Sequence, residues 1–588
     1  MDVNFNISKY VAAWTLTSVL DFSSNYFPSP STRHKNEQLE MFFPLIAAIV
    51  AACGIYYVYL TTLDYLALKK IRVRERTRLP PKVEQSPVKF GIDFYGRVSK
   101  AVEENRYLEL EMELLEKHGD TVSVSMFGKP MILTREPENI KAMLATQFED
   151  FSLGASRYNS FVPMLGDGIF THMYGGGESG QPWRHSRSVL RPQFARQQIQ
   201  DLVVLESFVQ NMFNLIPEKK TVDLQELFFK LSMDTATDFL FGGSVNSLLP
   251  DCLAQESQFY NDFTRGSEIL LHRITLQDFY WLQKDSTEFK KICKNMHAYL
   301  DKFTTKAIER QASGKPTSHD LGGKYVFLEE AAKEFQDPVR LRSELFNILL
   351  AGRDTTAGLL SICCHQLARH KDEWFRLRKE VIETLGNRKP TYEDIKSMKY
   401  LRYVLNETLR LFPVVPSNSR EAVKPTTLPR GGGPNGDQKV LIPKDTTVLY
   451  SVWSLHRSAK IYGPDATTFR PSRWETLRVG WNYLPFNGGP RICLGQQYAL
   501  TEASYVLIRL LQTFEDIENR DPNLHFIEDL RLTLACHGGL KQSLWGIAFS
   551  PIPLEVFMKA PFKLKPSYLR NVRDTNPPKA ECKKFSCR

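Results

Sequence analysis

The sequence lacks the cysteine spacing of a disulfide-stabilised or zinc-binding protein. Its 588 residues include nine cysteines, an odd number, and no two of them form a CxxC pair. In a chain of this length, that pattern indicates reduced thiols and a protein that faces the cytosol. The sequence also contains no internal repeat and no low-complexity block. Its 42% hydrophobic and 24% charged residues argue against extensive disorder and predict one large or two medium-sized domains.

The sequence has little net charge outside two short segments. The formal net charge is +10. Six Lys/Arg and one Asp/Glu lie between Lys69 and Arg78, and nine Lys/Arg and three Asp/Glu lie between Gly546 and Arg588. The rest of the chain is therefore close to neutral. A nucleic-acid-binding domain would usually carry its basic excess on a folded face, so we expect no nucleic acid among the partners.

One long stretch contains no charged residue. It runs over the 23 residues from Met41 to Leu63, which is long enough to cross a bilayer. A buried core helix is the alternative, but that helix would have to lie beside the basic residues that follow. We therefore predict a transmembrane helix over 41–63. The basic flank orients the preceding residues 1–40 towards the lumen and the rest of the chain towards the cytoplasm. We expect a single-pass protein of the endoplasmic reticulum membrane, with a possible glycan at the sequon of Asn6.

Behind this segment, the sequence predicts a mostly α-helical domain with small β-sheets. Residues 64–90 combine basic residues with several prolines, which is typical of a stiff hinge. Helical periodicity dominates from about residue 100 to 415, and loops and short strands follow. The short β-like runs lie at 122–126, 130–133, 439–442 and 446–450. We expect a single domain over 91–545 and a basic tail over 546–588.

The most informative segment is the loop from Phe486 to Gly495, with the sequence FNGGPRICLG. Its glycines, such as Gly489, allow a tight turn that brings backbone N–H groups near the sulfur of Cys493. Arg491 supplies a fixed positive charge. The residues after the loop have a helical pattern, so a helix N-terminus would favour the thiolate. A lone cysteine is usually a small buried hydrophobe, but the pattern FxxGxRxCxG fixes five positions.

This segment resembles the haem-binding signature of the cytochromes P-450. The resemblance implies the P-450 fold, with a single haem domain behind the transmembrane helix. It also implies haem b as the cofactor, with Cys493 as the axial ligand of the iron. By the same resemblance, Arg491 binds a haem propionate, while Phe486, Gly489 and Gly495 shape the haem-binding loop.

Two further motifs appear in the order that the family requires. A Glu and an Arg one helical turn apart occur at Glu407 and Arg410, and the stretch Pro471-Ser472-Arg473-Trp474 matches the PxRW/F motif. Alone, a Glu–Arg pair at this spacing is more often solvated. The resemblance implies instead a buried triad of Glu407, Arg410 and Arg473 that supports the haem loop.

Three residues match positions that contact haem propionates in the family. Trp183 and Arg187 resemble its WxxxR motif, and Arg420 resembles a propionate-binding arginine that follows the Glu–Arg pair. A tryptophan at helical spacing is normally a core residue, so the interpretation of Trp183 rests on motif order alone.

A long helix is predicted to begin at Asp337-Pro338 and to continue to about His370, because Asp is a good N-cap and Pro suits the first helical position. Gly and Thr in its middle reduce helix stability, and a tolerated bend is the plain interpretation. The segment Ala351-Gly352-Arg353-Asp354-Thr355-Thr356 nevertheless resembles the oxygen-binding motif of the family. That resemblance implies that Ala351 and Gly352 line the oxygen groove, and that Thr355 and Asp354 form the proton-delivery pair.

The activity implied is that of a haem–thiolate monooxygenase, which inserts one oxygen atom from O2 into a C–H bond of a lipophilic substrate. The stretches 347–357, 427–434 and 483–490 are similar to the fungal branch that hydroxylates alkanes and fatty acids near the terminal carbon. We expect no flavin domain in this chain, so electrons would come from NADPH–cytochrome P-450 reductase in the same membrane. Membrane lipid would be a further partner.

Other functions stay open at this point. The same fold could oxidise a polyketide or terpenoid in fungal secondary metabolism. A haem–thiolate isomerase or dehydratase would commonly depart from the Asp354–Thr355 pattern. A non-catalytic haem carrier or sensor would not require that pair. Two departures from the family, a long segment at 172–180 and the tail after Trp545, leave the identity of the substrate undetermined.

Overall fold

The computed structural model describes residues 66–547 apart from 87–90, 175–179, 195–201, 283–285, 322–323 and 524, together with residues 48, 51–56, 58–59 and 62–63. The expected lumenal segment with Asn6, and nearly all of the basic tail, lie outside these residues. The expected transmembrane segment 41–63 is described only in part. Among the described residues, no helix is both long enough and apolar enough to cross a membrane.

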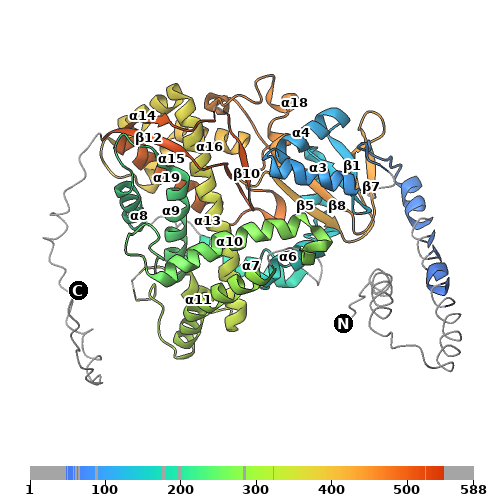
Figure 1. Cartoon of the computed structure of the whole chain (residues 1–588), viewed down its shortest axis with the longest axis horizontal. Helices are drawn as coiled ribbons and strands as arrows, with labels where there is room; N and C mark the ends of the chain where they lie inside the picture. The colour runs from blue at the N-terminus through green and yellow to red at the C-terminus, as the bar shows by residue number, and fades with distance from the viewer. Residues whose placement is uncertain are drawn as a thin grey trace, which may run out of the picture.

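The described body is mostly helical with four small sheets, as the sequence predicts (Figure 1). The helices before the long central one are α3 Ile92–Glu103, α4 Tyr107–His118, α5 Pro137–Lys141, α6 Ala155–Leu165, α7 Gln181–Leu190, α8 Leu202–Asn214, α9 Leu224–Phe241, α10 Ala254–Thr275, α11 Ser286–Ala312 and α12 Phe327–Ala331. The central helix and those after it are α13 Pro338–Arg369, α14 Lys371–Leu385, α15 Tyr392–Ser397, α16 Lys399–Leu411, α17 Val452–His456, α18 Ala459–Tyr462 and α19 Gln496–Thr513.

The largest sheet has five strands in the order β1-β2-β8-β5-β3. Its strands are β1 Thr121–Met126, β2 Lys129–Thr134, β3 Phe151–Ser152, β5 Ser417–Ala422 and β8 Thr447–Ser451. Only β2 and β8 pair in parallel. The smaller sheets join β6 Thr426–Gly432 to β7 Gln438–Ile442, β10 Glu528–Leu530 to β11 Leu534–Cys536, and β4 Val222–Asp223 to β12 Lys541–Ile547 and β9 Phe514–Asn519. The β-like runs at 122–126, 130–133 and 439–442 therefore lie in strands, and the run at 446–450 does so from Thr447 onwards.

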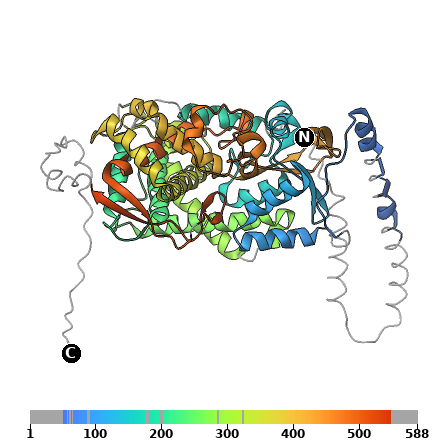
Figure 2. The ribbon, with the colours of Figure 1, turned by 90° about the horizontal axis from the view of Figure 1, so that it is seen from above.

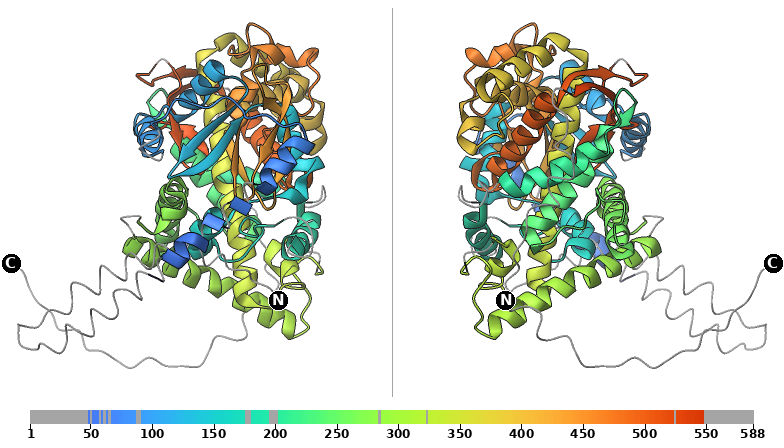
Figure 3. Two further views of the ribbon diagram at one scale, coloured as in Figure 1. Left: turned by 90° about the vertical axis from the view of Figure 1, so that its right-hand side faces the viewer. Right: turned by 90° about the vertical axis from the view of Figure 1, so that its left-hand side faces the viewer.

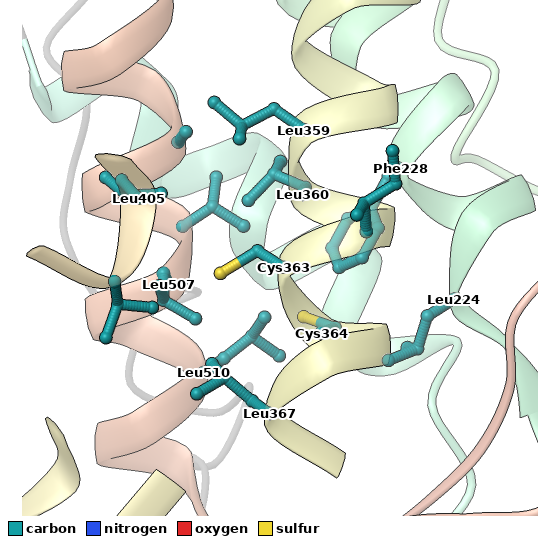
Figure 4. Packing of buried hydrophobic residues seen from close by; sticks show 14 of the residues in the cluster. Leu224, Phe228, Leu359, Leu360, Cys363, Cys364, Leu367, Leu405, Leu507 and Leu510 are labelled. Atoms are coloured by element: carbon teal, nitrogen blue, oxygen red, sulfur yellow. The ribbon is translucent and has the colours of Figure 1, made fainter. Parts of the chain in front are cut away.

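Helix α13 begins and ends where the sequence predicts. The side chain of Asp337 accepts a hydrogen bond from the backbone N–H of Val339 at 3.1 Å, and Pro338 is the first helical residue. The helix continues for 32 residues to Arg369 and runs through the middle of the body (Figure 3). Side chains from α9, α16 and α19 pack around its C-terminal half, where Cys363 and Cys364 are fully buried (Figure 4). The seven described cysteines are all free thiols.

The segment that precedes the body is held to it at two places. The backbone of Arg78 donates a hydrogen bond to the carbonyl oxygen of Lys439 in β7. Val83 donates to the carbonyl of Ser123 in β1, and Ser123 donates back to Pro81. Residues 66–74 form a helix that lies beside the body rather than within it (Figure 2). The side chain of Gln85 also exchanges two hydrogen bonds with the backbone of Ser125 in β1. The expected hinge over 64–90 is thus anchored to the sheets between Arg78 and Gln85.

Candidate active site

The cysteine loop is a tight turn that rests on neighbouring backbone. The N–H of Cys493 donates to the carbonyl of Phe486 at 3.0 Å, which closes the loop immediately before α19. Gly489 has a φ of +68°, and a Cβ there would lie 1.8 Å from the carbonyl oxygen of Leu144. Leu144 belongs to η2, a π-helical turn over Ala142–Thr146. Only glycine can occupy position 489 without displacing this turn.

Cys493 is an exposed residue, although the protein atoms around its thiol are close enough to desolvate it. Burial raises the pKa of the Cys493 thiol, while a hydrogen bond from the backbone of Gly495 and the charge of Arg187 act to lower it. The N-terminus of α19 therefore faces the sulfur, as the sequence predicts, but burial outweighs it. A bound metal cation deprotonates a coordinating thiol outright, so this environment fits a thiolate that forms on metal binding.

Four arginines converge close to this loop, and among the described residues no carboxylate forms an ion pair with any of them. The pKa of Arg491 is lowered to about 8, first by burial and then by the charges of Arg420, Arg157 and Arg187. Burial and the charge of Arg420 likewise lower the pKa of Arg157 to about 10. Such a cluster is electrostatically unfavourable unless anions neutralise it. Two haem propionates would supply that neutralisation, so the residues present fit the cofactor.

Each predicted propionate-binding residue lies in this cluster. Arg491 stacks over the ring of Trp183, with 4.6 Å from the guanidinium carbon to the ring centroid. Arg187 lies 5.7 Å from the same centroid and donates to the carbonyl of Ile492 at 3.0 Å. Arg420, on β5, is 3% exposed. Trp183 on α7 is therefore both a core residue and a platform for two of the arginines.

The segment at 172–180, which is long for the family, contributes directly to the site. One Nη of Arg491 donates to the carbonyl oxygens of His172 and Tyr174, each at 2.9 Å. These backbone acceptors fix the guanidinium without neutralising its charge. The sequence did not predict this contact, because every residue has a backbone carbonyl and its role as an acceptor does not depend on residue type.

Arg157 was also missed by sequence reasoning. It lies in the first turn of α6, donates to the side-chain oxygen of Asn418 at 3.1 Å, and has a buried Nε atom without a hydrogen-bond partner. An unsatisfied buried donor is costly, which indicates that an anion belongs beside it. No motif surrounds Arg157, so only its position in the fold identifies it.

Glu407 lies at the centre of the buried triad. Its carboxylate accepts two hydrogen bonds from Arg410, both at 2.8 Å, one from Arg473 at 3.4 Å and one from the indole of Trp474 at 3.0 Å. Arg473 has a second partner that the sequence did not reveal, because its two Nη atoms contact the carboxylate of Asp465 at 3.0 and 3.1 Å. The structure thus brings Glu407, Arg410 and Arg473 together.

The middle of α13 has two unlike sides. Ala351, Gly352 and Thr355 are half-buried and lie on one side of the helix, whereas Arg353 and Asp354 are buried on the other. Thr355 Oγ1 donates to the carbonyl of Ala351 at 2.7 Å, and Asp354 accepts from Arg353. Asp354 and Thr355 are adjacent in the chain, but no hydrogen bond joins their side chains among the described contacts.

The chain is similar to several known proteins over most of its length. The family model described as cytochrome P450 matches residues 89–534. A cytochrome P450 monooxygenase of Aspergillus japonicus, himC, is 43% identical over 465 residues, which cover 78% of this chain and 82% of that protein. Cytochrome P450 52A13 of Debaryomyces hansenii is 43% identical over 474 residues, which cover 77% of this chain and 89% of that protein. Cytochrome P450 52A10 of Candida maltosa is 47% identical over 412 residues, which cover 67% of this chain and 77% of that protein.

Proposed function

The chain belongs to the cytochrome P450 family, and we propose that it is a membrane-anchored haem–thiolate monooxygenase that hydroxylates long-chain alkanes or fatty acids near the terminal carbon. The family carries a haem iron, and its monooxygenases are oxidoreductases. The observation that carries the proposal is the position of Cys493 at the N-terminus of α19, close to four arginines that form no ion pair with a carboxylate among the described residues. The similarity to several cytochromes P450 52A supports a lipophilic substrate.

The cofactor would be haem b, whose iron would be held by the sulfur of Cys493 and whose carboxylates would be held by Arg157, Arg187, Arg420 and Arg491. When bound, the haem supplies an iron centre at which O2 is activated by electrons from a reductase. In the overall reaction one C–H bond becomes C–O–H, the O–O bond breaks, and the second oxygen leaves as water with two protons. NADPH supplies both electrons through NADPH–cytochrome P-450 reductase and becomes NADP⁺.

The chain itself would supply position and protons. Ala351 and Gly352 leave room beside α13, since a Cβ added at Gly352 would meet only the Cβ of Ala236, at 3.8 Å. We assign proton delivery to Thr355 Oγ1, which must leave the carbonyl of Ala351 to donate elsewhere, and to Asp354 as the acid beside it. Glu407, Arg410 and Arg473 would act only by holding the segments around the loop in place.

The decisive test uses the full-length protein in microsomes with the reductase and NADPH. We expect a hydroxyl group near the terminal carbon of long-chain alkanes or fatty acids, identified by mass spectrometry. The matched control is the same preparation of Cys493→Ala. Turnover of a polyketide or terpenoid alone would favour a tailoring enzyme. A haem-loaded protein that consumes no NADPH with any lipophilic substrate would contradict the proposal and favour a carrier or sensor.

We further propose that residues 41–63 anchor the protein in the endoplasmic reticulum membrane, with the catalytic domain in the cytoplasm. The charge-free stretch followed by basic residues supports this topology. Protease added to intact microsomes should then degrade the domain over 91–545. An endoglycosidase should increase the electrophoretic mobility of the wild type by removing the glycan at Asn6. It should not change the mobility of Asn6→Gln. Protection of the domain from protease would contradict the orientation.

A further inference from the structure

Arg353 lies in the middle of α13 and is almost completely buried, at 2% exposure. Its Nη1 atom donates to Asp354 Oδ1 at 2.6 Å, and its Nη2 atom donates to Thr264 Oγ1 at 2.9 Å. The guanidinium carbon also lies 4.6 to 5.4 Å from the ring centroids of Phe229, Tyr260 and Phe263. A buried cation in an aromatic enclosure gains cation–π attraction and keeps its charge only with an anionic partner.

The partner in this enclosure is Asp354. Burial acts to lower the pKa of Arg353, but the charge of Asp354 and the Tyr260 hydroxyl outweigh burial, so the pKa is raised. The enclosure is not fully optimised, because the Nε atom of Arg353 is buried without a hydrogen-bond partner. An unsatisfied buried donor reduces stability. Packing alone would therefore be served better by an apolar residue, and the arginine needs another explanation.

That explanation lies in what Arg353 does to Asp354. The bond from Arg353 holds Oδ1 on the side of α13 that faces α9 and α10, whereas the hydroxyl of Thr355 lies on the opposite, half-buried side. The carboxylate is thereby fixed in place through Oδ1, and Oδ2 is the oxygen left for proton exchange. We propose that Arg353 is the positioning residue of the proton-delivery pair. This inference rests on the proposed function, since it deepens the role assigned to Asp354.

Arg353 acts only through Asp354 in this scheme. Without the guanidinium, the buried carboxylate loses the donor that holds Oδ1 and leaves its position. Protons then reach the reaction less reliably, and O2 is reduced by two electrons and two protons to hydrogen peroxide instead of being split. A general acid typically contributes at least about 100-fold to the rate. A residue that only positions this acid should contribute less, and we expect about tenfold.

The first experiment compares Arg353→Gln with the wild type in the reductase-supported reaction. We expect the fraction of NADPH electrons recovered in product to fall about tenfold, with matching peroxide, and the solvent isotope effect on turnover to rise. Arg353→Lys, which keeps the charge, should recover part of this coupling. The haem content and the ferrous–CO spectrum should stay as in the wild type. Unchanged coupling in a haem-loaded Arg353→Gln protein would overturn the proposal.

The matched control lies on the same helix. Arg342 pairs with Asp301 of α11 at 2.8 Å, so Arg342→Gln also removes one ion pair from α13 without touching Asp354. We expect this variant to keep the coupling of the wild type. A fall equal to that of Arg353→Gln would mean that any lost ion pair of α13 disturbs the reaction, and it would overturn the specific role of Arg353.

A second set of variants covers the case in which Arg353→Gln does not fold. A buried ion pair can often be replaced as a unit by uncharged residues, so Arg353→Met with Asp354→Asn should fold. Its coupling should equal that of Asp354→Asn alone, and a further fall would overturn the proposal. The change in denaturant midpoint of the double variant should also differ from the sum of the changes in the two single variants.

The failure of this inference can be told from the failure of the proposed function. A wild-type protein that forms no product would refute the proposed function. A coupled wild type with equally coupled variants would refute only this inference.

Discussion

The guanidinium of Arg491 lies 4.6 Å above the ring centroid of Trp183, so a residue of the cysteine loop stacks on a residue of α7 from a distant part of the sequence. The same guanidinium is held by the backbone of His172 and Tyr174. Its position is therefore fixed from two sides before any anion binds. This arrangement makes Trp183 a positioning group for Arg491 as well as a core residue.

We expect Trp183→Leu to weaken haem retention. The substitution removes the ring beneath Arg491, and a cation–π contact of this kind contributes about 0.5 to 2 kcal/mol, so haem should dissociate roughly twofold to thirtyfold faster. The measurement is the rate of haem transfer to an excess of a haem-scavenging protein. Trp183→Phe keeps an aromatic ring and serves as the control. Equal rates for Trp183→Leu and the wild type would show that the stack does not hold Arg491.

Cys493→Ala should abolish monooxygenase activity and the thiolate-type absorption of the ferrous–CO complex, because no other described thiol lies in the loop before α19. Absorption spectroscopy of the reduced protein under CO checks this outcome. Cys364→Ala, which removes a thiol buried in the core, should lower stability but keep the thiolate spectrum. Persistence of that spectrum in Cys493→Ala would refute the ligand assignment.

Thr355→Ala should retain haem and consume NADPH but release more of the electrons as hydrogen peroxide. The hydroxyl that donates to Ala351 at 2.7 Å is lost, and with it the group assigned to proton delivery. Peroxide and product measured against NADPH consumption give the coupling directly. Thr355→Ser keeps a hydroxyl and should retain most of the coupling. If Thr355→Ala stayed coupled and Thr355→Ser did not, proton delivery could not be assigned to the hydroxyl of Thr355.

Glu407→Gln should yield little folded, haem-containing protein. The carboxylate is fully buried against Arg410 and Arg473, and removing one partner of a buried ion pair costs about 3 to 5 kcal/mol. The yield of soluble protein and its denaturant midpoint test this expectation. Glu475→Gln is the matched control, because the ion pair of Glu475 with Arg376 is half-exposed and contributes little. A wild-type midpoint for Glu407→Gln would exclude a supporting role for the triad.

Glu502 of α19 should make stability depend on pH. Burial raises the pKa of its carboxyl to about 7, although Thr235 donates to it and acts to lower the pKa. Between the unfolded pKa of about 4.3 and about 7, the folded protein holds a proton that the unfolded chain releases. Stability from this group is therefore greatest at low pH and falls as pH rises through that window.

Glu502→Gln should remove that dependence, because its amide oxygen can still accept from Thr235 but carries no charge at any pH. Unfolding midpoints of the two proteins should be similar below about pH 4.3 and should diverge progressively up to about pH 7. Above that pH the difference stays constant, with the variant more stable by a few kcal/mol. The comparison uses the difference between variants, so other titrating groups cancel. Parallel pH profiles would show that folding does not raise the pKa of the Glu502 carboxyl.

The sequence and the structure agree best where one short segment contains both the signal and the contact. The start of α13 is an example, since Asp337 caps the helix by accepting a hydrogen bond from the backbone N–H two positions further on. Glu407 and Arg410 are likewise neighbours on one helical turn. The positions of Arg157 beside Arg420, of Asp465 beside Arg473, and of the carbonyls that hold Arg491 could not be predicted, because each contact joins separate elements and involves common surface residues or backbone atoms.

The contact between Gly489 and the carbonyl of Leu144 bears on how this protein tolerates changes in chain length. The carbonyl is presented by a π-helical turn, which contains one residue more than an α-helical turn. Ala142, Met143 and Leu144 are buried, so their side chains can change only to apolar ones of similar volume, but such changes leave that backbone oxygen in place. Deleting a single residue there would restore ordinary helix, rotate the oxygen away and release the cysteine loop. Among relatives, this turn should therefore accept apolar substitutions of similar volume but resist insertion and deletion.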